Sequence, residues 1–173
     1  MRGPGARSAA EALRAFLGPL RRSLSCVTDA VLVGGGRGPA PALQTAALQG
    51  GVPVPLVGQD RLLLRVAIGY RLVRDGDAWV AEVGSYVVGL DRAGAGELVA
   101  YHWHPDALSP VRWPHLHVGA GSGARAPVLG AHLPTGTVGL PVVVRMAIME
   151  LGARPRRDDW EVVLAAAEAE LAI

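Results

Sequence analysis

The chain has 173 residues, of which half are hydrophobic and 18% are charged, a composition that excludes a chain disordered throughout. Its length suits one domain over residues 1–173 with a core of its own. Seventeen basic side chains, all arginine, are nearly balanced by fifteen acidic ones, and the formal charge of +2 gives no reason by itself to infer nucleic-acid binding. A single cysteine excludes an internal disulfide. The sequence shows neither a secretory signal pattern nor an apolar run of about 18 residues, so we expect a cytoplasmic protein with no membrane span.

The first predicted element is a helix over residues 9–25. Ser8 followed by Glu11 has the spacing of a capping box, in which each residue's side chain accepts a hydrogen bond from the backbone N–H of the other. Apolar residues then recur at helical intervals, which indicates a surface helix docked by one face. Gly18 and Pro19 interrupt the pattern, so we expect a bend there.

Glycine and proline dominate residues 31–59, a segment almost free of charge. Its glycine cluster lacks the Lys-Ser/Thr pair of a phosphate-binding loop, and no strand–helix–strand pattern follows it. The pattern therefore favours a connector, with one short helical turn over residues 42–48.

Residues 61–118 are predicted to form an antiparallel sheet. Asp75-Gly76-Asp77 is a strong hairpin signal, and residues 91–96 supply a second, glycine-rich turn. Pro114 lacks a backbone donor, so we expect the last strand to be an edge strand or to carry a bulge. Short connections between four strands describe a meander, with strands expected at residues 61–74, 79–90, 97–104 and 112–118.

Two helices are expected in the C-terminal part, residues 140–171. Gly152 is a natural C-cap for the first of them. Asp158 with Glu161 has the spacing of a cap for the second, which we expect over residues 160–171. The predicted class is therefore α+β: a four-stranded antiparallel meander covered on one face by an N-terminal helix and two C-terminal helices.

Histidines are the strongest functional signal in the sequence. All five lie between residues 102 and 132, and four of them occur in the segment YHWHPDALSPVRWPHLHV as two His-x-His pairs. Imidazole is the side chain whose ordinary pKa lies nearest to neutral pH. The side chains best suited to exchange protons near pH 7 are therefore concentrated in one short segment. The pairs are His102 with His104 and His115 with His117, and His132 is a weaker, fifth candidate.

The spacing of the pairs makes a geometric prediction. Residues two apart on a strand face the same way, so each pair shares one face of its strand. On the first strand this alternation adds Leu98 and Ala100 to the histidine face and puts Tyr101 on the other. If the two strands are neighbours, one of two registers brings all four imidazoles together, and the sequence does not say which.

Converging imidazoles permit two kinds of chemistry. In general acid–base catalysis a neutral imidazole accepts a proton while a protonated one donates a proton, and cleavage of RNA at its own 2′-hydroxyl needs only this and a cation for the phosphate. Arg112 and Tyr101 are the nearest candidates to assist, and this catalytic interpretation needs no cofactor. In the alternative, the four paired histidines bind a divalent transition metal in a non-enzymatic metal-binding or protein-interaction module. Asp106 is then the only carboxylate close by in sequence.

Three features occur in a characteristic order: Tyr101-His102-Trp103, the run from Trp113 to His117, and the helix expected between Leu140 and Leu151. This order resembles the small TumE-type toxins of prokaryotic toxin–antitoxin pairs, over residues 61–151. The resemblance implies an RNA-directed toxin that is held by a cognate antitoxin protein. Residues 1–60 have no counterpart in that pattern, and the sequence is also compatible with a homo-oligomer.

Overall fold

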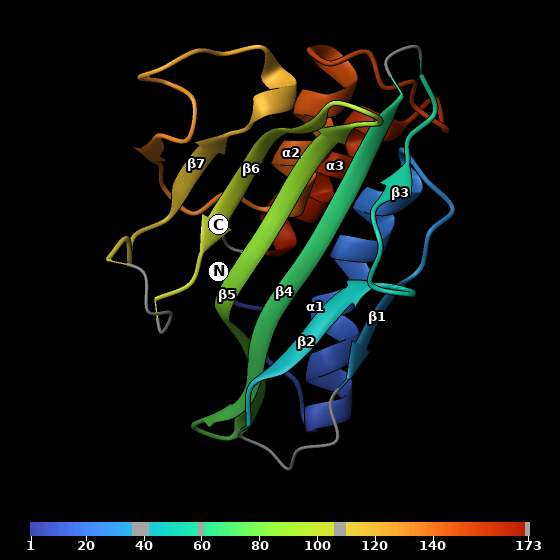
Figure 1. Cartoon of the computed structure of the whole chain (residues 1–173). Coiled ribbons are helices and arrows are strands. Elements are labelled where there is room, and N and C mark those ends of the chain that lie inside the picture. The colour runs from blue at the N-terminus through green and yellow to red at the C-terminus, as the bar shows by residue number, and fades with distance from the viewer. Residues whose placement is uncertain (36–41, 59–60, 106–109, 172–173) are drawn as a thin grey trace.

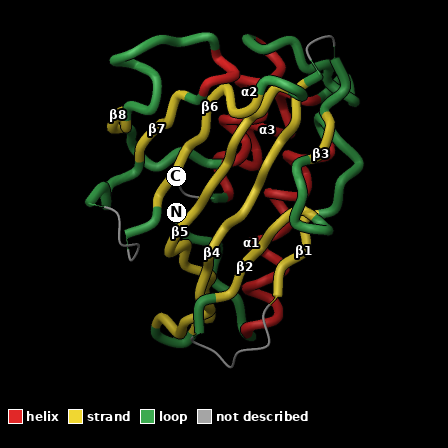
Figure 2. Tube along the Cα trace, in the orientation of Figure 1, coloured by secondary structure: helices red, strands yellow, loops and turns green. Residues whose placement is uncertain are grey.

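The computed structural model describes residues 1–35, 42–58, 61–105 and 110–171. In this part of the chain an antiparallel sheet carries three helices on one face, and no helix covers the face turned toward the viewer in Figures 1 and 2. The helices are α1 (Ala9–Ser25), α2 (Leu140–Met149) and α3 (Trp160–Glu170), with a 3₁₀ turn η1 (Ala120–Ser122). The strands are β1 (Leu32–Gly35), β2 (Gln44–Leu48), β3 (Val54–Pro55), β4 (Leu62–Asp75), β5 (Ala78–Arg92), β6 (Gly96–Trp103), β7 (His115–Val118) and β8 (His132–Pro134).

The α+β class is confirmed, but the sheet is larger than the four strands predicted. Its order is β1-β2-β4-β5-β6-β7-β8, and β3 pairs with β4 beside β2. The predicted meander is the central part, β4 to β7. The connector prediction for residues 31–59 is wrong where the chain forms β1, β2 and β3. Within the helical turn expected over residues 42–48, residues 44–48 form β2 instead: Ala46 pairs with Ile68 of β4 and is fully buried.

The long hairpin of β4 and β5 is the scaffold of the sheet. The strands have 14 and 15 residues, and only Gly76 and Asp77 lie between them, as the hairpin signal predicts. On β4 the even-numbered side chains from Leu62 to Leu72 are buried, and they face the helices. Tyr70 meets Phe16 of α1, with 5.5 Å between ring centroids. The opposite face of β4 and β5 is left for polar and small side chains.

The helices begin largely where the sequence indicates. Ser8 and Glu11 form the predicted capping box at α1, and the helix continues through Pro19. The predicted cap at Asp158 is wrong, since the N-cap of α3 is Asp159 and its side chain makes no cap hydrogen bond. That carboxylate is instead held by the Arg157 guanidinium.

Strand β7 is not an edge strand, contrary to the expectation from Pro114. Strand β8 pairs with its outer side, and Pro114 lies just before the strand, where its carbonyl accepts a hydrogen bond from Thr135. The register shifts are found between β4 and β5 and between β5 and β6 instead.

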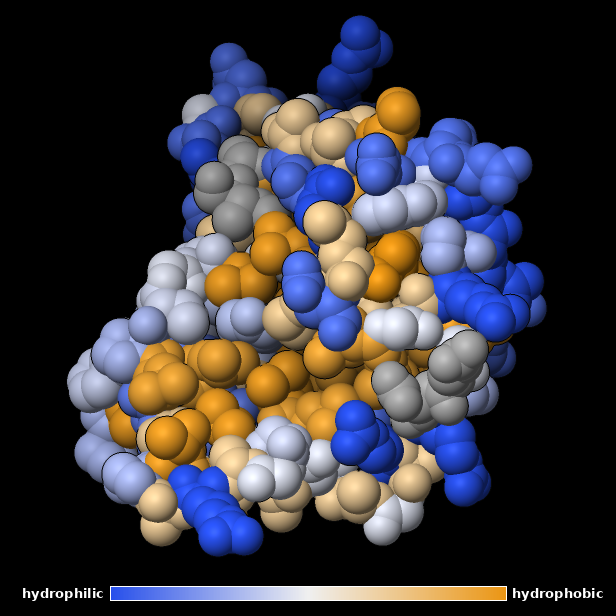
Figure 3. All heavy atoms as spheres, turned by 90° about the horizontal axis from the view of Figure 1, so that it is seen from above, coloured by the Kyte–Doolittle hydropathy of each residue, from blue (hydrophilic) through white to orange (hydrophobic). Residues whose placement is uncertain are grey.

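The loop from β7 to β8 closes one end of the sheet. It leaves β7 at Gly119, whose N–H donates to Leu98, and returns at Gly130, whose N–H donates to Val118. Val128 and Leu129 in this loop are exposed, and the view onto this end of the molecule shows apolar residues gathered at its lower left (Figure 3). Among the described residues, no helix is both long enough and apolar enough to cross a membrane.

Candidate active site

The structure has the register that brings the paired histidines together. Strands β6 and β7 are antiparallel neighbours in which His102 lies opposite His115 and Ala100 lies opposite His117. Strand β8 then places His132 opposite His117. All five imidazoles therefore form one cluster, the histidine cluster, on the helix-free face of the sheet.

The rings of the cluster are close neighbours, and two of them lie inside. His102 and His115 each have three imidazole neighbours, whereas the other three histidines have two each. Ring centroids are 5.8 Å apart for His102–His104, 5.5 Å for His102–His115, 6.0 Å for His102–His117, 5.5 Å for His104–His115, 4.9 Å for His115–His132 and 5.5 Å for His117–His132. His115 and the Nε2 atom of His102 are buried, so a ligand approaching from solvent meets the three outer rings first, those of His104, His117 and His132.

His117 is held by a carboxylate. Its Nδ1 lies 2.5 Å from Oε1 of Glu97 on β6, and both side chains are only partly exposed, at 31% and 21%. An ionised carboxylate can only accept, so Nδ1 carries the proton and the Nε2 atom of His117 is left for a ligand. Such a contact fixes the orientation of the ring.

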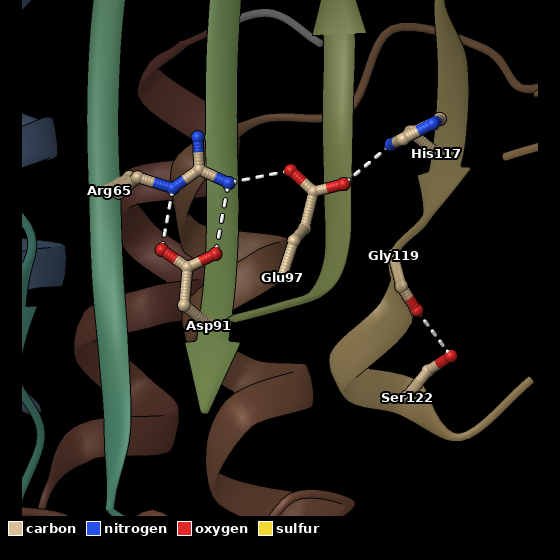
Figure 4. A network of polar contacts seen from close by, with 6 residues as sticks. All are labelled: Arg65, Asp91, Glu97, His117, Gly119 and Ser122. Carbon is tan, nitrogen blue, oxygen red and sulfur yellow. Dashed lines mark hydrogen bonds and ion pairs between the residues drawn. The ribbon is translucent and has the colours of Figure 1, made fainter. Parts of the chain in front are cut away.

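Glu97 is in turn held by Arg65, and the contacts run across four strands (Figure 4). Arg65 of β4 donates from Nη2 to Glu97 at 2.6 Å, and from Nε and Nη2 to Asp91 of β5 at 2.7 and 3.0 Å. Burial by itself would raise the pKa of the Glu97 carboxyl, but hydrogen bonds from His117 and Arg65 outweigh burial and leave the pKa below its ordinary value. Glu97 is therefore an anion beside His117 at neutral pH.

His115 is oriented by a backbone carbonyl. Its Nδ1 lies 2.9 Å from the oxygen of Trp113, and because a carbonyl only accepts, Nδ1 donates and Nε2 has the free lone pair of the neutral ring. The residue is only 1% exposed. His115 therefore supports the outer rings and is not itself reachable from solvent.

His102 is the other inner ring, and it is neutral. Burial lowers its pKa to about 4, and the nearby imidazoles act in the same direction against the opposing charge of Glu97. Its Nε2 atom is buried and has no hydrogen-bond partner. At neutral pH His102 is therefore an uncharged residue inside the cluster.

His132 completes the outer rings. It is exposed, and its pKa is lowered by desolvation and then by repulsion from His115, His117 and His104. The neutral form of His132 is thus favoured at neutral pH, and its neighbour His117 contacts the Glu97 carboxylate through Nδ1. Two neighbouring imidazoles in such different surroundings can act as an acid–base pair.

The two residues predicted to assist the histidines, Tyr101 and Arg112, lie in different places. Tyr101 lies on the helix face, where its hydroxyl contacts the sulfur of Met146 at 3.7 Å; it is not part of the histidine cluster, and its inclusion among the catalytic candidates is corrected. Arg112 is exposed and donates from Nη1 to the carbonyl of Pro105 at 3.1 Å, beside His104. Asp106 lies outside the described residues.

Sequence reasoning missed Glu97 because of a bulge. Leu90 pairs with Val99 but Asp91 pairs with Glu97, so Leu98 is an extra residue in β6 and reverses the alternation before it. Leu98 consequently packs in the helix-side core, contrary to the predicted face, and Glu97 joins the histidine face. The sequence signal that existed was an acidic residue at the start of a histidine strand.

The cluster does not form a ready metal site. Within the described ranges, no group of three or more His, Cys, Asp or Glu side chains is arranged to hold a metal ion as the side chains stand. The imidazoles are close enough in space, and the rings would have to turn for their nitrogens to meet at one ion.

Comparison of the chain with protein-family models, with curated proteins and with solved structures finds no match in any of the three.

Proposed function

We propose that the protein is a toxin-like ribonuclease that cleaves RNA by general acid–base catalysis at the histidine cluster. The observation that carries the proposal is the pairing of His117, held by the Glu97 carboxylate at 2.5 Å, with the neighbouring His132, whose neutral form is favoured. Their ring centroids lie 5.5 Å apart on an accessible face of the sheet. An acid and a base side by side supply the two proton transfers of the reaction.

In this mechanism each histidine has one role. Neutral His132 takes the proton from the ribose 2′-hydroxyl, and that oxygen attacks the adjacent phosphorus. Protonated His117 gives its proton to the departing 5′-oxygen, so the products are a 2′,3′-cyclic phosphate and a free 5′-hydroxyl. The two histidines end with exchanged protonation states and return to the starting form by proton exchange with water.

The remaining residues support this pair. Arg112 is the candidate cation for the phosphate, because its guanidinium is exposed beside the end of β6 and an arginine pairs well with phosphate oxygens. His104 is the third outer ring. A cognate antitoxin protein that covers this face would block all of these groups together, as the resemblance to TumE-type toxins implies.

The test is cleavage of a single-stranded RNA oligonucleotide by purified protein in the presence of a chelator. We expect products ending in a 2′,3′-cyclic phosphate, no cleavage of the matching DNA oligonucleotide, and a loss of about 100-fold or more in His117→Ala and in His132→Ala. Arg154→Ala, outside the cluster, serves as the control variant. RNA left intact by the wild-type protein, or full activity in both folded histidine variants, contradicts the proposal.

A divalent transition metal site is the second candidate, and a specific observation favours it. The Nδ1 atoms of His115 and His117 are held by an acceptor, which leaves their Nε2 atoms as potential ligands, and Nε2 of His102 is buried without a partner. Elemental analysis of the purified protein separates the two candidates. Stoichiometric metal that disappears in His102→Ala, in a protein that leaves RNA intact, favours the metal site.

A further inference from the structure

The helix-free face of the sheet has two hollows beside the histidine cluster. One, which we call the Arg65 hollow, has a volume of about 260 Å³ and is lined by Leu48, Val52, Arg65, Ala67 and Val87 among others. The second, the His104 hollow, has a volume of about 180 Å³ and is lined by Thr45, Ala67, Ser85, Val87 and His104 among others. Both are smaller than the roughly 300–1,000 Å³ of sites that hold drug-sized ligands, so each has room for a single ring system.

The two hollows are adjacent to each other and to the cluster. They share Ala67 and Val87 as a common wall, and Val87 is the direct cross-strand partner of His102. From Arg65 to Gly69, which lines the second hollow, β4 advances about 13 Å at the rise of an extended strand. A ligand that fills both hollows thus lies along β4 and β5, and its middle is next to the histidines.

Small residues make this face hollow. A side chain at Gly69 would come within 2.3 Å of the Ser85 hydroxyl, and one at Gly89 within 2.8 Å of the Arg65 guanidinium. Because Gly69 and Gly89 have no side chains, Ser85 and Arg65 can lie against the sheet, and the surface between them stays recessed. Most of the lining is apolar, with hydroxyls from Thr45 and Ser85 at the edge of the His104 hollow, a surface that suits a flat heterocycle with polar edges.

We propose that the two hollows bind the bases of two successive nucleotides of a single-stranded RNA that continues across the sheet to the histidine cluster. The inference rests on the proposed ribonuclease function and adds the substrate class: RNA whose neighbouring bases are unstacked and turned toward the protein, which a duplex cannot present. The bases lie over β4 and β5, and the histidines of the proposed acid–base pair are on β7 and β8, two and three strands beyond β5. At about 4.8 Å per strand this is about 10–14 Å, so the scissile phosphate belongs to the next part of the RNA, which crosses β6. A hollow of about 470 Å³ between α1 and Arg156 is on another part of the molecule, and its Arg156 is paired with Asp29.

The test measures binding separately from cleavage. The probe is a dinucleotide with 2′-deoxyribose, which has no 2′-hydroxyl to attack the phosphate and therefore stays intact. Ala67→Leu fills the common wall of both hollows from an exposed position, and Ala165→Leu on the exposed face of α3 is the matched control. We expect the probe to bind at least five-fold more weakly to Ala67→Leu than to the wild type and equally well to the control, by calorimetric titration.

Backbone amide NMR of the wild-type protein gives an independent measurement that does not depend on whether a variant folds. The inference predicts that the probe shifts the signals of Thr45, Ser85 and Val87. Unchanged affinity in Ala67→Leu, shifts confined to other surfaces, or no binding at all would overturn it. If the probe binds in the hollows but the protein leaves RNA intact, the base-binding sites are supported and the ribonuclease proposal is refuted. If the protein cleaves RNA and Ala67→Leu has an unchanged KM, the ribonuclease proposal is supported and the base-binding sites are refuted.

Discussion

Glu97 is the residue on which the proposed chemistry depends most, since its carboxylate contacts Nδ1 of His117 and orients the ring. In Glu97→Gln the orientation of the ring can persist but the anion is gone. We expect kcat for RNA cleavage to fall by about 10–100-fold with little change in KM, as is typical when a residue that orients a catalytic histidine is replaced.

Asp91→Asn is the matched control at the residue scale. It removes the other carboxylate that binds Arg65 and leaves the contact between Glu97 and His117 in place. A smaller loss of kcat is expected there. Equal effects of the two substitutions would mean that the network acts only as structural support.

At the scale of elements, the turn after β7 determines where Glu97 sits. A β carbon added at Gly119 would lie 2.2 Å from the Glu97 carbonyl oxygen and 2.6 Å from the Glu97 β carbon, and neither atom can swing away. We expect Gly119→Ala to lower the free energy of unfolding by about 1–3 kcal/mol, the usual cost of overpacking, and to reduce RNA cleavage by displacing Glu97 from His117. Urea unfolding and the cleavage assay measure the two effects.

Gly136→Ala is the control for that substitution, because an added β carbon meets nothing within 4 Å there. It should leave both stability and cleavage close to the wild type. A stable Gly119→Ala protein would mean that β6 and the turn separate at little cost.

How much of this could be read from the sequence also differs by element. The β4–β5 hairpin and α1 are predictable because their signals are local: a two-residue turn, apolar alternation and a capping box. Strand β2 is not, since QTAAL has little β character of its own and is held as a strand by pairing with β4. The shared face of the histidine pairs follows from the period of a strand, but their register, the bulge at Leu98 and the role of Glu97 depend on pairing between strands, which a single sequence does not encode locally.

For the molecule as a whole, the histidine cluster makes stability depend on pH. His102 takes up a proton in the unfolded chain below its ordinary pKa of 6.5 but in the folded protein only below about 4. Between these values the unfolded state binds more protons, so stability is full above about pH 6.5 and is lost as the pH falls toward 4, by up to about 3 kcal/mol. Glu97 adds to the loss below its ordinary pKa of 4.5, because its folded pKa is lowered and the stabilisation from its ionised form disappears as it is protonated.

Urea unfolding at pH 7, 5.5 and 4.5 measures this dependence. We expect the wild type to lose stability steadily over this range, and His102→Gln, which cannot be protonated, to lose much less between pH 6.5 and 4.5. His132→Gln should retain most of the wild-type loss, because the pKa of the exposed His132 is lowered less in the folded protein than the pKa of His102. If the free energy of unfolding of the wild type does not change down to pH 4.5, the folded protein accommodates a charged His102. The assignment of His102 as a neutral inner residue of the cluster would then be wrong.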